Sequence, residues 1–221
     1  MYGLREVELD GAPLKEHKNQ LGPCTIEGRY VRLDPLQVMH CDALLEAAKE
    51  SEWTWIPNDL RSRQSMDKWI SDSLAEQSRG ESCIFVVEYQ NKIVGSTRYM
   101  DIQPAHKGVE IGWTWYARSV WGTVVNPECK FLLLKHAFED WGAIRVQLKT
   151  DNNNIHSQNA ILKLGAKFEG RLRNQRIRRD GSFRDNMMYS IIREEWPQVK
   201  EGLLRRIAGL SEDKITEPVK P

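Results

Sequence analysis

The segment from Val109 to Trp141 constrains the fold most, because it predicts a strand, a loop and a helix in direct succession. Apolar residues alternate with polar or small ones at its start, which is typical of a strand with one apolar face. The apolar positions are Val109, Ile111, Trp113 and Trp115. Asn126 and Pro127 then have the pattern of a helix N-cap followed by a first-turn proline. We expect the helix to run to Trp141, with Gly142 ending it.

The helix that follows the loop is expected to be amphipathic. Its predicted inner face consists of Phe131, Leu134, Phe138 and Trp141, and its outer face of Lys130, Lys135 and Glu139. The first turn of a helix leaves backbone N–H groups unpaired and carries partial positive charge, so a loop that ends there can hold a phosphate. A ligand with a pyrophosphate could dock on the loop and lay an amide-bearing arm along the strand.

Five short motifs follow one another along the chain in a distinctive order and spacing. Residues 110–115, 121–130, 149–157, 160–166 and 169–170 read EIGWTW, WGTVVNPECK, KTDNNNIHS, AILKLGA and EG. They resemble the GNAT N-acetyltransferases, and more narrowly the RimJ/RimL-type branch that acetylates the N-termini of ribosomal proteins. The resemblance covers about residues 26–196. It implies an α/β domain with a mixed, mostly antiparallel twisted sheet of about seven strands, flanked by helices, which binds acetyl-coenzyme A as cosubstrate.

The resemblance also implies which residues hold the cofactor. Main-chain N–H groups of the strand should bind the acetyl oxygen and the pantetheine amides, and the loop should bind the pyrophosphate. The expected cofactor-binding residues are Trp113, Thr114, Trp115, Tyr116, Trp121, Gly122, Thr123, Val124, Val125, Asn126 and Asn154. The family usually has a glycine in place of Val124, and a β-branched residue disfavours positive φ. Cofactor binding could therefore be weaker, or Gly122, Thr123 and the helix end could make most of the contacts with the phosphates.

Acetyl transfer to an amine needs a base, donors for the carbonyl oxygen as it gains charge, and a proton for the departing thiolate. Glu110 is predicted to lie on the strand face opposite the rings of Trp113 and Trp115, and it matches the general base of some GNAT enzymes. The alternative is a glutamate that is paired with an arginine.

Ser157 is the candidate acid, because it follows Asn154 by three residues as in the family. On the alternative interpretation, Asn154 caps a helix and Ser157 is an ordinary first-turn residue. Many relatives place a tyrosine slightly further along, where this chain has Phe168. If Ser157 is not the acid, water can serve.

Trp53 and Trp55 lie on a connection that cannot be helical through Pro57. Their rings could fill the core beneath this connection. In the family the same connection lines the acceptor site, so we expect both rings to be walls of a substrate pocket. The acceptor is a primary amine, and protein N-termini, amino acids, polyamines and drug amines all remain open.

Six arginines gather on a predicted closing hairpin: Arg171, Arg173, Arg176, Arg178, Arg179 and Arg184. Such a cluster usually forms a solvated face that resists edge-to-edge pairing, partly neutralised here by Asp151 and Asp185. It could also contact an acidic acceptor or nucleic acid. The 32 Lys and Arg against 31 Asp and Glu give a net charge of +1, which argues against a dedicated nucleic-acid binder.

Composition predicts one globular domain with a full core, in a reducing, cytoplasmic compartment. The four cysteines are widely spaced, Cys129 is expected in the core, and no apolar stretch approaches the length of a membrane span. The histidines His40, His106 and His156 have no metal-ligand spacing, so no metal is expected. We expect a monomer or a homodimer.

The predicted organisation is a loosely held N-terminal arm over 1–23, the domain over 24–208 and a tail over 209–221. Strands are expected at 25–33, 82–89, 92–101, 109–115, 145–150, 167–177 and 183–192, and helices at 37–48, 65–80, 126–141, 154–165 and 194–207. A second hypothesis is a non-catalytic acetyl-coenzyme A binder or interaction protein that keeps the fold, supported by Val124 and the missing tyrosine.

Overall fold

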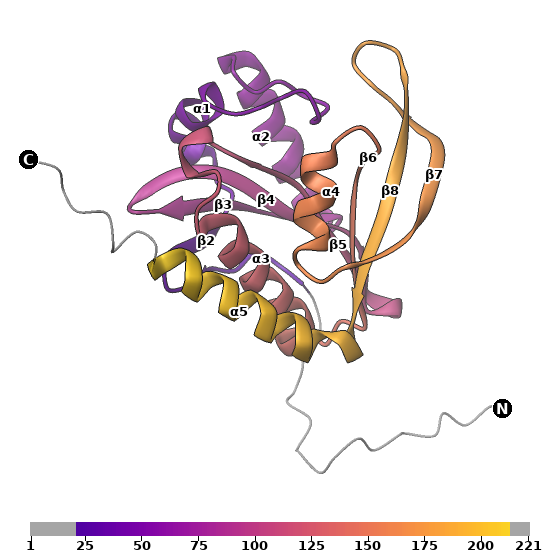
Figure 1. Cartoon of the computed structure of the whole chain (residues 1–221). Helices are drawn as coiled ribbons and strands as arrows, with labels where there is room; N and C mark the ends of the chain where they lie inside the picture. Colours follow the sequence, from indigo (N-terminus) through magenta and orange to yellow (C-terminus); the bar gives the residue numbers. More distant parts are fainter. Residues whose placement is uncertain (1–20, 213–221) are drawn as a thin grey trace, which may run out of the picture.

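A computed structural model describes residues 21–212, which form an α/β domain built on one eight-stranded sheet (Figure 1). The strands are β1 (Ile26–Glu27), β2 (Val31–Pro35), β3 (Ser82–Tyr89), β4 (Lys92–Gln103), β5 (Gly108–Tyr116), β6 (Arg145–Asp151), β7 (Lys167–Ile177) and β8 (Phe183–Ile192). The helices are α1 (Cys41–Lys49), α2 (Arg63–Ser78), α3 (Val125–Lys135), α4 (Ile155–Leu162) and α5 (Trp196–Glu212).

The sheet is mixed and mostly antiparallel, as predicted. Its order is β1-β2-β3-β4-β5-β6-β8-β7, and among the neighbouring pairs β5 and β6 run parallel. The strand count exceeds the expected seven because the predicted first strand is broken over residues 28–30 into β1 and β2.

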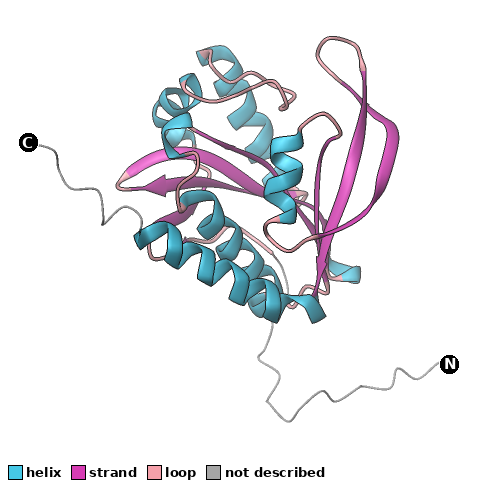
Figure 2. Ribbon diagram, in the orientation of Figure 1, coloured by secondary structure: helices cyan, strands magenta, loops and turns pink. Residues whose placement is uncertain are grey.

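Helices cover both faces of the sheet (Figure 2). Helices α1 and α2 lie on one face, where Leu44, Trp69 and Trp115 belong to one apolar cluster. Helices α3 and α5 lie on the other face, where Leu133 and Leu203 belong to a second cluster. The sheet itself separates the two clusters, and its central strands contribute side chains to both.

A bulge in β5 reverses the direction of its side chains. Trp113 has a φ of 51°, and the register against β4 shifts between Ser96 and Arg98. Before the bulge, Ile111 packs on the α3 side; after it, Trp115 packs on the α1–α2 side. The prediction that 109, 111, 113 and 115 share one face is therefore wrong, because an extra residue in one strand shifts the alternation by one.

The strands β5 and β6 separate after a short parallel contact. They pair only from Gly108↔Arg145 to Glu110↔Gln147, while β5 continues to pair with β4 as far as Tyr116. The sheet therefore opens from Ile111 onward, because the pairing of β5 with β6 ends at Glu110. From Ile111 onward, one edge of β5 has no strand beside it within the region described.

Helix α3 begins slightly earlier than predicted. Val124 is its N-cap, and the first helical hydrogen bond runs from Glu128 N to Val124 O at 3.0 Å. Asn126 and Pro127 lie within the first turn, where proline costs no hydrogen bond, and are not the cap and first residue. The helix continues as a π-helical turn, His136–Asp140, and Gly142 follows with a φ of 76°.

The predicted faces of α3 need one correction. Lys130 is 7% exposed, although its spacing predicts the outer face. Phe131 is only half-buried and packs on Trp196 of α5, with ring centroids 6.3 Å apart. Because α3 is covered by the sheet and by α5, its buried surface is wider than a single apolar stripe.

The packed domain extends past both predicted boundaries. Leu21 is 3% exposed and belongs to the core, and α5 runs to Glu212. Residues 1–20 of the predicted arm and 213–221 of the predicted tail lie outside the described residues. In the part of the chain that the structure covers, no helix is both long and apolar enough to cross a membrane.

Candidate active site

The free edge of β5 leads directly into a loop and the start of α3. Gly122 takes the positive φ of this loop, at 73°. The hydroxyl of Thr123 donates to Val120 O at 2.7 Å and accepts from Val125 N at 3.3 Å, which holds the turn. The opening between β5 and β6 therefore ends at a helix N-terminus, the geometry that favours an anion.

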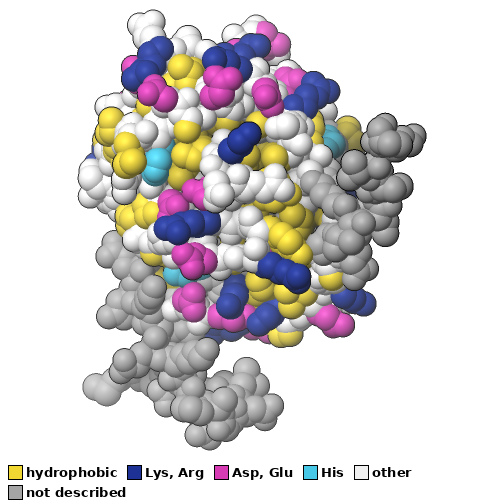
Figure 3. Space-filling model, turned by 90° about the vertical axis from the view of Figure 1, so that its left-hand side faces the viewer, with side chains coloured by type: hydrophobic (Ala, Val, Ile, Leu, Met, Phe, Trp, Pro, Cys, Tyr) yellow, Lys and Arg dark blue, Asp and Glu magenta, His cyan; other side chains and the backbone are white. Residues whose placement is uncertain are grey.

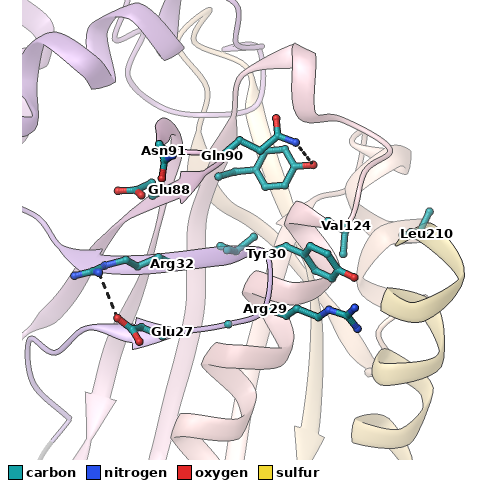
Figure 4. A pocket seen from close by; sticks show the side chains of 12 residues that line it. Glu27, Arg29, Tyr30, Arg32, Glu88, Gln90, Asn91, Val124 and Leu210 are labelled. Atoms are coloured by element: carbon teal, nitrogen blue, oxygen red, sulfur yellow. Dashed lines mark hydrogen bonds and ion pairs between the residues drawn. The ribbon is translucent and has the colours of Figure 1, made fainter. Parts of the chain in front are cut away.

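Val124 does not strain this loop. Its φ is −64°, an ordinary helical value, so the glycine that the family usually has here is not required for backbone conformation. The side chain is 4% exposed and lines a hollow of about 560 Å³ together with Tyr30 and Leu210 (Figure 4). The β-branched side chain therefore causes no backbone strain here, because the residue with positive φ is Gly122.

Glu128 ties the start of α3 to the first hairpin. Its carboxylate accepts from Arg29 N at 2.7 Å, Tyr30 N at 2.9 Å and Val31 N at 2.9 Å. Burial raises the pKa of Glu128 above its usual value, against the opposing effect of these three donors. A Cβ on Gly28 would lie 2.9 Å from Glu128 Oε1, so this turn needs glycine.

The loop also reaches the start of α4. The Trp121 indole N–H donates to Tyr116 O at 3.1 Å, and its ring stacks on His156, with centroids 5.6 Å apart and planes at 17°. Asn154 Oδ1 accepts from Ser157 N at 3.0 Å, so Asn154 is the N-cap of α4. The structure thus brings the predicted loop residues and the predicted Asn154–Ser157 pair to one place.

Glu110 lies where β5 and β6 part. Its side chain is 2% exposed, and Oε2 accepts from Lys149 Nζ at 2.8 Å and from Gln147 Nε2 at 2.9 Å. The ion-pair partner is a lysine of β6 and not an arginine. Because of the bulge, Glu110 and the Trp113 and Trp115 rings share the same side of the sheet, which corrects the predicted opposition.

The two tryptophans of the 53–57 connection have different environments. Trp53 is 2% exposed, its ring lies 5.1 Å from that of Trp115, and its indole N–H donates to Ala48 O at 2.9 Å. Trp53 is therefore a core residue beneath the connection. Trp55 is half-buried.

The β7–β8 hairpin contacts this connection. The guanidinium of Arg179, in the turn after β7, donates to Trp53 O.

Sequence reasoning missed two buried cations beside the bulge. Arg98 of β4 lies over the rings of Trp69 and Trp113, at 5.6 and 4.9 Å, and donates to Glu76 at 2.9 Å. Burial lowers the pKa of Arg98 to about 10. On the opposite side of the sheet, Lys130 Nζ donates to Thr114 Oγ1 at 2.6 Å. Neither position carries a pattern that distinguishes it from a surface cation.

The arginine hairpin is partly neutralised by the two aspartates predicted for that role. Arg178 pairs with Asp151 at 2.7 Å, and Arg171 pairs with Asp185. Arg173 and Arg176 have no ion pair with any described residue. Elsewhere charge is mixed: on the face shown in Figure 3, cationic and acidic side chains are interspersed.

Cys129 is a core residue, as predicted. It is fully buried in α3, and burial raises the pKa of its thiol to about 12. Across residues 21–212, no group of three His, Cys, Asp or Glu side chains is arranged to hold a metal ion.

Comparison with known proteins gives one consistent family. Residues 31–167 match the model of the acetyltransferase (GNAT) domain. A solved structure from T. thermophilus, named as an acetyltransferase, is 35% identical, with 84% of this chain and 98% of that chain covered and a TM-score of 0.74. A search of the curated proteins gave no match.

Two further structures share the fold. A GCN5-related N-acetyltransferase from Brucella melitensis is 26% identical, covers 88% of this chain and 87% of its own, and has a TM-score of 0.76. RimJ of Mycobacterium smegmatis, solved in complex with CoA-disulfide, is 24% identical over 88% of this chain and 98% of its own, with a TM-score of 0.72.

Proposed function

Since this chain belongs to the GNAT acetyltransferase family, we propose that it moves the acetyl group of acetyl-coenzyme A to a primary amine by direct attack in a ternary complex. The observation that carries the proposal is the free edge of β5, which begins at Ile111 and runs into the loop and N-terminus of α3. An edge of unpaired N–H groups suits an amide-bearing arm, and the helix start suits a pyrophosphate.

The residues present fit this cosubstrate. Gly122, Thr123 and the first N–H groups of α3 would hold the pyrophosphate, and Trp121 and Asn154 would flank the arm between β5 and α4. The Trp113–Tyr116 backbone would donate to the acetyl oxygen as it gains charge; one such donor contributes roughly 3 kcal/mol in the transition state. Acetyl-coenzyme A supplies the activated thioester.

Glu110 is the proposed base, acting directly or through water, and Ser157 the proposed acid. Glu110 lies where the opening begins, and Gly112 leaves space beside it, since a Cβ there would lie 3.2 Å from Glu110 Oε1. Lys149 and Gln147 both donate to Oε2, so Oε1 is the oxygen that is proposed to accept the proton. Trp55, at the surface of its connection, is the proposed wall for the acceptor.

The buried Glu110–Lys149 pair also favours a second candidate, a non-catalytic acetyl-coenzyme A binder, because Lys149 and Gln147 already occupy one oxygen of this carboxylate. Turnover distinguishes the two. An enzyme releases thiol when offered amines, and replacing Glu110 by Gln and Ser157 by Ala abolishes release without loss of binding; a binder has no turnover to lose.

The direct test is calorimetric titration with acetyl-coenzyme A, followed by a thiol-release screen over N-terminal peptides, amino acids and polyamines. We expect micromolar binding. The absence of heat at millimolar ligand would refute both candidate functions.

A further inference from the structure

Lys130 is a buried cation without a buried anion beside it. It is 7% exposed, and the acceptor that the structure shows for its ammonium is the hydroxyl of Thr114. That hydroxyl shares a second hydrogen bond, of 2.8 Å, with Thr97 Oγ1. Within residues 21–212 no carboxylate pairs with Lys130, and the nearby Glu128 is engaged by the 29–31 backbone. A buried charge is costly unless an opposite charge reaches it, so this site suits an anion.

The position of the ammonium indicates which anion. Lys130 follows Val125, the first residue of α3, by five positions, which is about 7.5 Å along the helix axis. Its partner Thr114 lies in β5 after the bulge, in the segment proposed to hold the acetyl end of the cosubstrate. The backbone of Lys130 thus lies one to two turns beyond the helix start, where phosphates bind, and its ammonium reaches the strand proposed to hold the acetyl end.

We propose that Lys130 stabilises the thiolate of coenzyme A as the acetyl group leaves, an inference that rests on the proposed function. In that step the amine nitrogen forms a bond to the carbonyl carbon, and the carbon–sulfur bond breaks with its electron pair going to sulfur. The amine proton goes to Glu110. The ammonium of Lys130 balances the charge on sulfur until Ser157 or water protonates it.

At neutral pH the Lys130 ammonium is charged, and the groups around it are neutral. Burial lowers the pKa of Lys130 to about 8, so the ammonium is still mostly protonated at pH 7. On the same helix, burial raises the pKa of the Cys129 thiol to about 12. From β5, the Tyr116 hydroxyl has a pKa raised well above its usual value, also by burial. Thr114, which accepts from the ammonium, and Thr97, which contacts Thr114, do not titrate.

The test measures the pKa of the coenzyme A thiol when bound, by ultraviolet absorbance of the thiolate across a pH series. In the wild type we expect this pKa to fall by at least about one unit relative to free coenzyme A, which equals a tenfold preference for the thiolate. Lys130→Met should remove the fall, Lys130→Arg should retain most of it, and Lys135→Met, a surface lysine on the same helix, should not change it.

Calorimetry with a coenzyme A fragment that lacks the pantetheine arm shows whether Lys130 contacts the phosphates or the thiolate. Equal affinity of the wild type and Lys130→Met for this fragment supports the proposal, and weaker affinity of Lys130→Met would assign Lys130 to the phosphates instead. A bound thiol pKa equal to that of free coenzyme A in the wild type would overturn the proposal even if Lys130→Met does not fold. Absence of coenzyme A binding would refute the proposed function as well.

Discussion

Glu110 is the residue on which the catalytic proposal depends. Gln keeps the shape and the hydrogen-bonding capacity toward Lys149 while removing the charge and the basicity. We expect Glu110→Gln to lower kcat by roughly 100-fold or more, the usual contribution of general-base catalysis. Affinity for acetyl-coenzyme A should be unchanged.

Steady-state kinetics and calorimetry measure these two quantities separately. Glu81→Gln, which changes an exposed glutamate in the α2–β3 turn, is the matched control and should behave as wild type. Unchanged kcat in Glu110→Gln would remove Glu110 from the mechanism.

The burial of Lys130 also predicts how the free energy of unfolding depends on pH, independently of catalysis. Burial lowers its pKa from 10.5 to about 8, so between these values the unfolded chain binds more protons than the folded one. The free energy of unfolding contributed by this residue therefore rises with pH across that window and is lower below it. Lys130→Met should lack this rise.

Urea denaturation of both proteins at pH about 7.5 and about 10 isolates the effect, because the other titrating groups are common to both. The difference in stability between variant and wild type should shift with pH by up to about 3 kcal/mol. A difference that is constant with pH would show that the buried amine is not desolvated.

At the scale of elements, the loop between β5 and α3 contains one glycine, Gly122, and one position, Val124, where the family usually has a glycine. Gly122 needs its positive φ, and Val124 does not. Gly122→Ala should cost about 1 kcal/mol of stability from backbone strain alone, because the space around it is open. It should also weaken binding of acetyl-coenzyme A, since the turn is proposed to present N–H groups to the phosphates.

Val124→Gly is the informative counterpart. Despite restoring the family's usual residue, it should destabilise the fold by roughly 1–3 kcal/mol through loss of a buried side chain, with no gain in affinity. Thermal unfolding and calorimetry provide both measurements. Tighter binding in Val124→Gly would show that the valine obstructs the phosphates after all.

The bulge in β5 explains why the fold was easier to predict than the site. Alternation over 109–115 correctly predicted a strand, and the motif predicted the loop and helix after it. A single extra residue at Trp113 then moved the rings of Trp113 and Trp115 to the side of Glu110. No local sequence pattern predicts such a bulge, because the bulge depends on pairing with β4 and on Arg98 stacking against Trp113.

The burial of Lys130 is a second feature that could not be predicted from the sequence. Its charge and spacing place it on the outer face of an amphipathic helix, and it is buried because the β-sheet and α5 cover α3 from two directions. Likewise, Trp53 and Trp55 are equivalent in the sequence, and only the packing of Trp53 on Trp115 separates them. Tertiary context that the sequence does not display decided each of these cases.

At the scale of the molecule, the β7–β8 hairpin reaches across to the 53–57 connection. Arg179 is the link, through Trp53 O. If the acceptor enters between these two parts, Arg179→Ala should raise the KM for the amine several-fold and leave the Kd for acetyl-coenzyme A unchanged. Arg205→Ala, on the exposed side of α5, is the control. An equal effect on both ligands would indicate general loosening instead.

The contacts of Glu128 carry a consequence for how the chain is made. Three backbone N–H groups at 29–31 find their acceptor in a residue about a hundred positions later. On a ribosome, the turn that joins β1 and β2 therefore emerges long before the group that completes it. Its amides must remain hydrated until α3 has been synthesised and docked. The β1–β2 turn is thus secured only when α3 docks, long after β1 and β2 have been made, and the helix that is proposed to bind the phosphates also fixes the first hairpin.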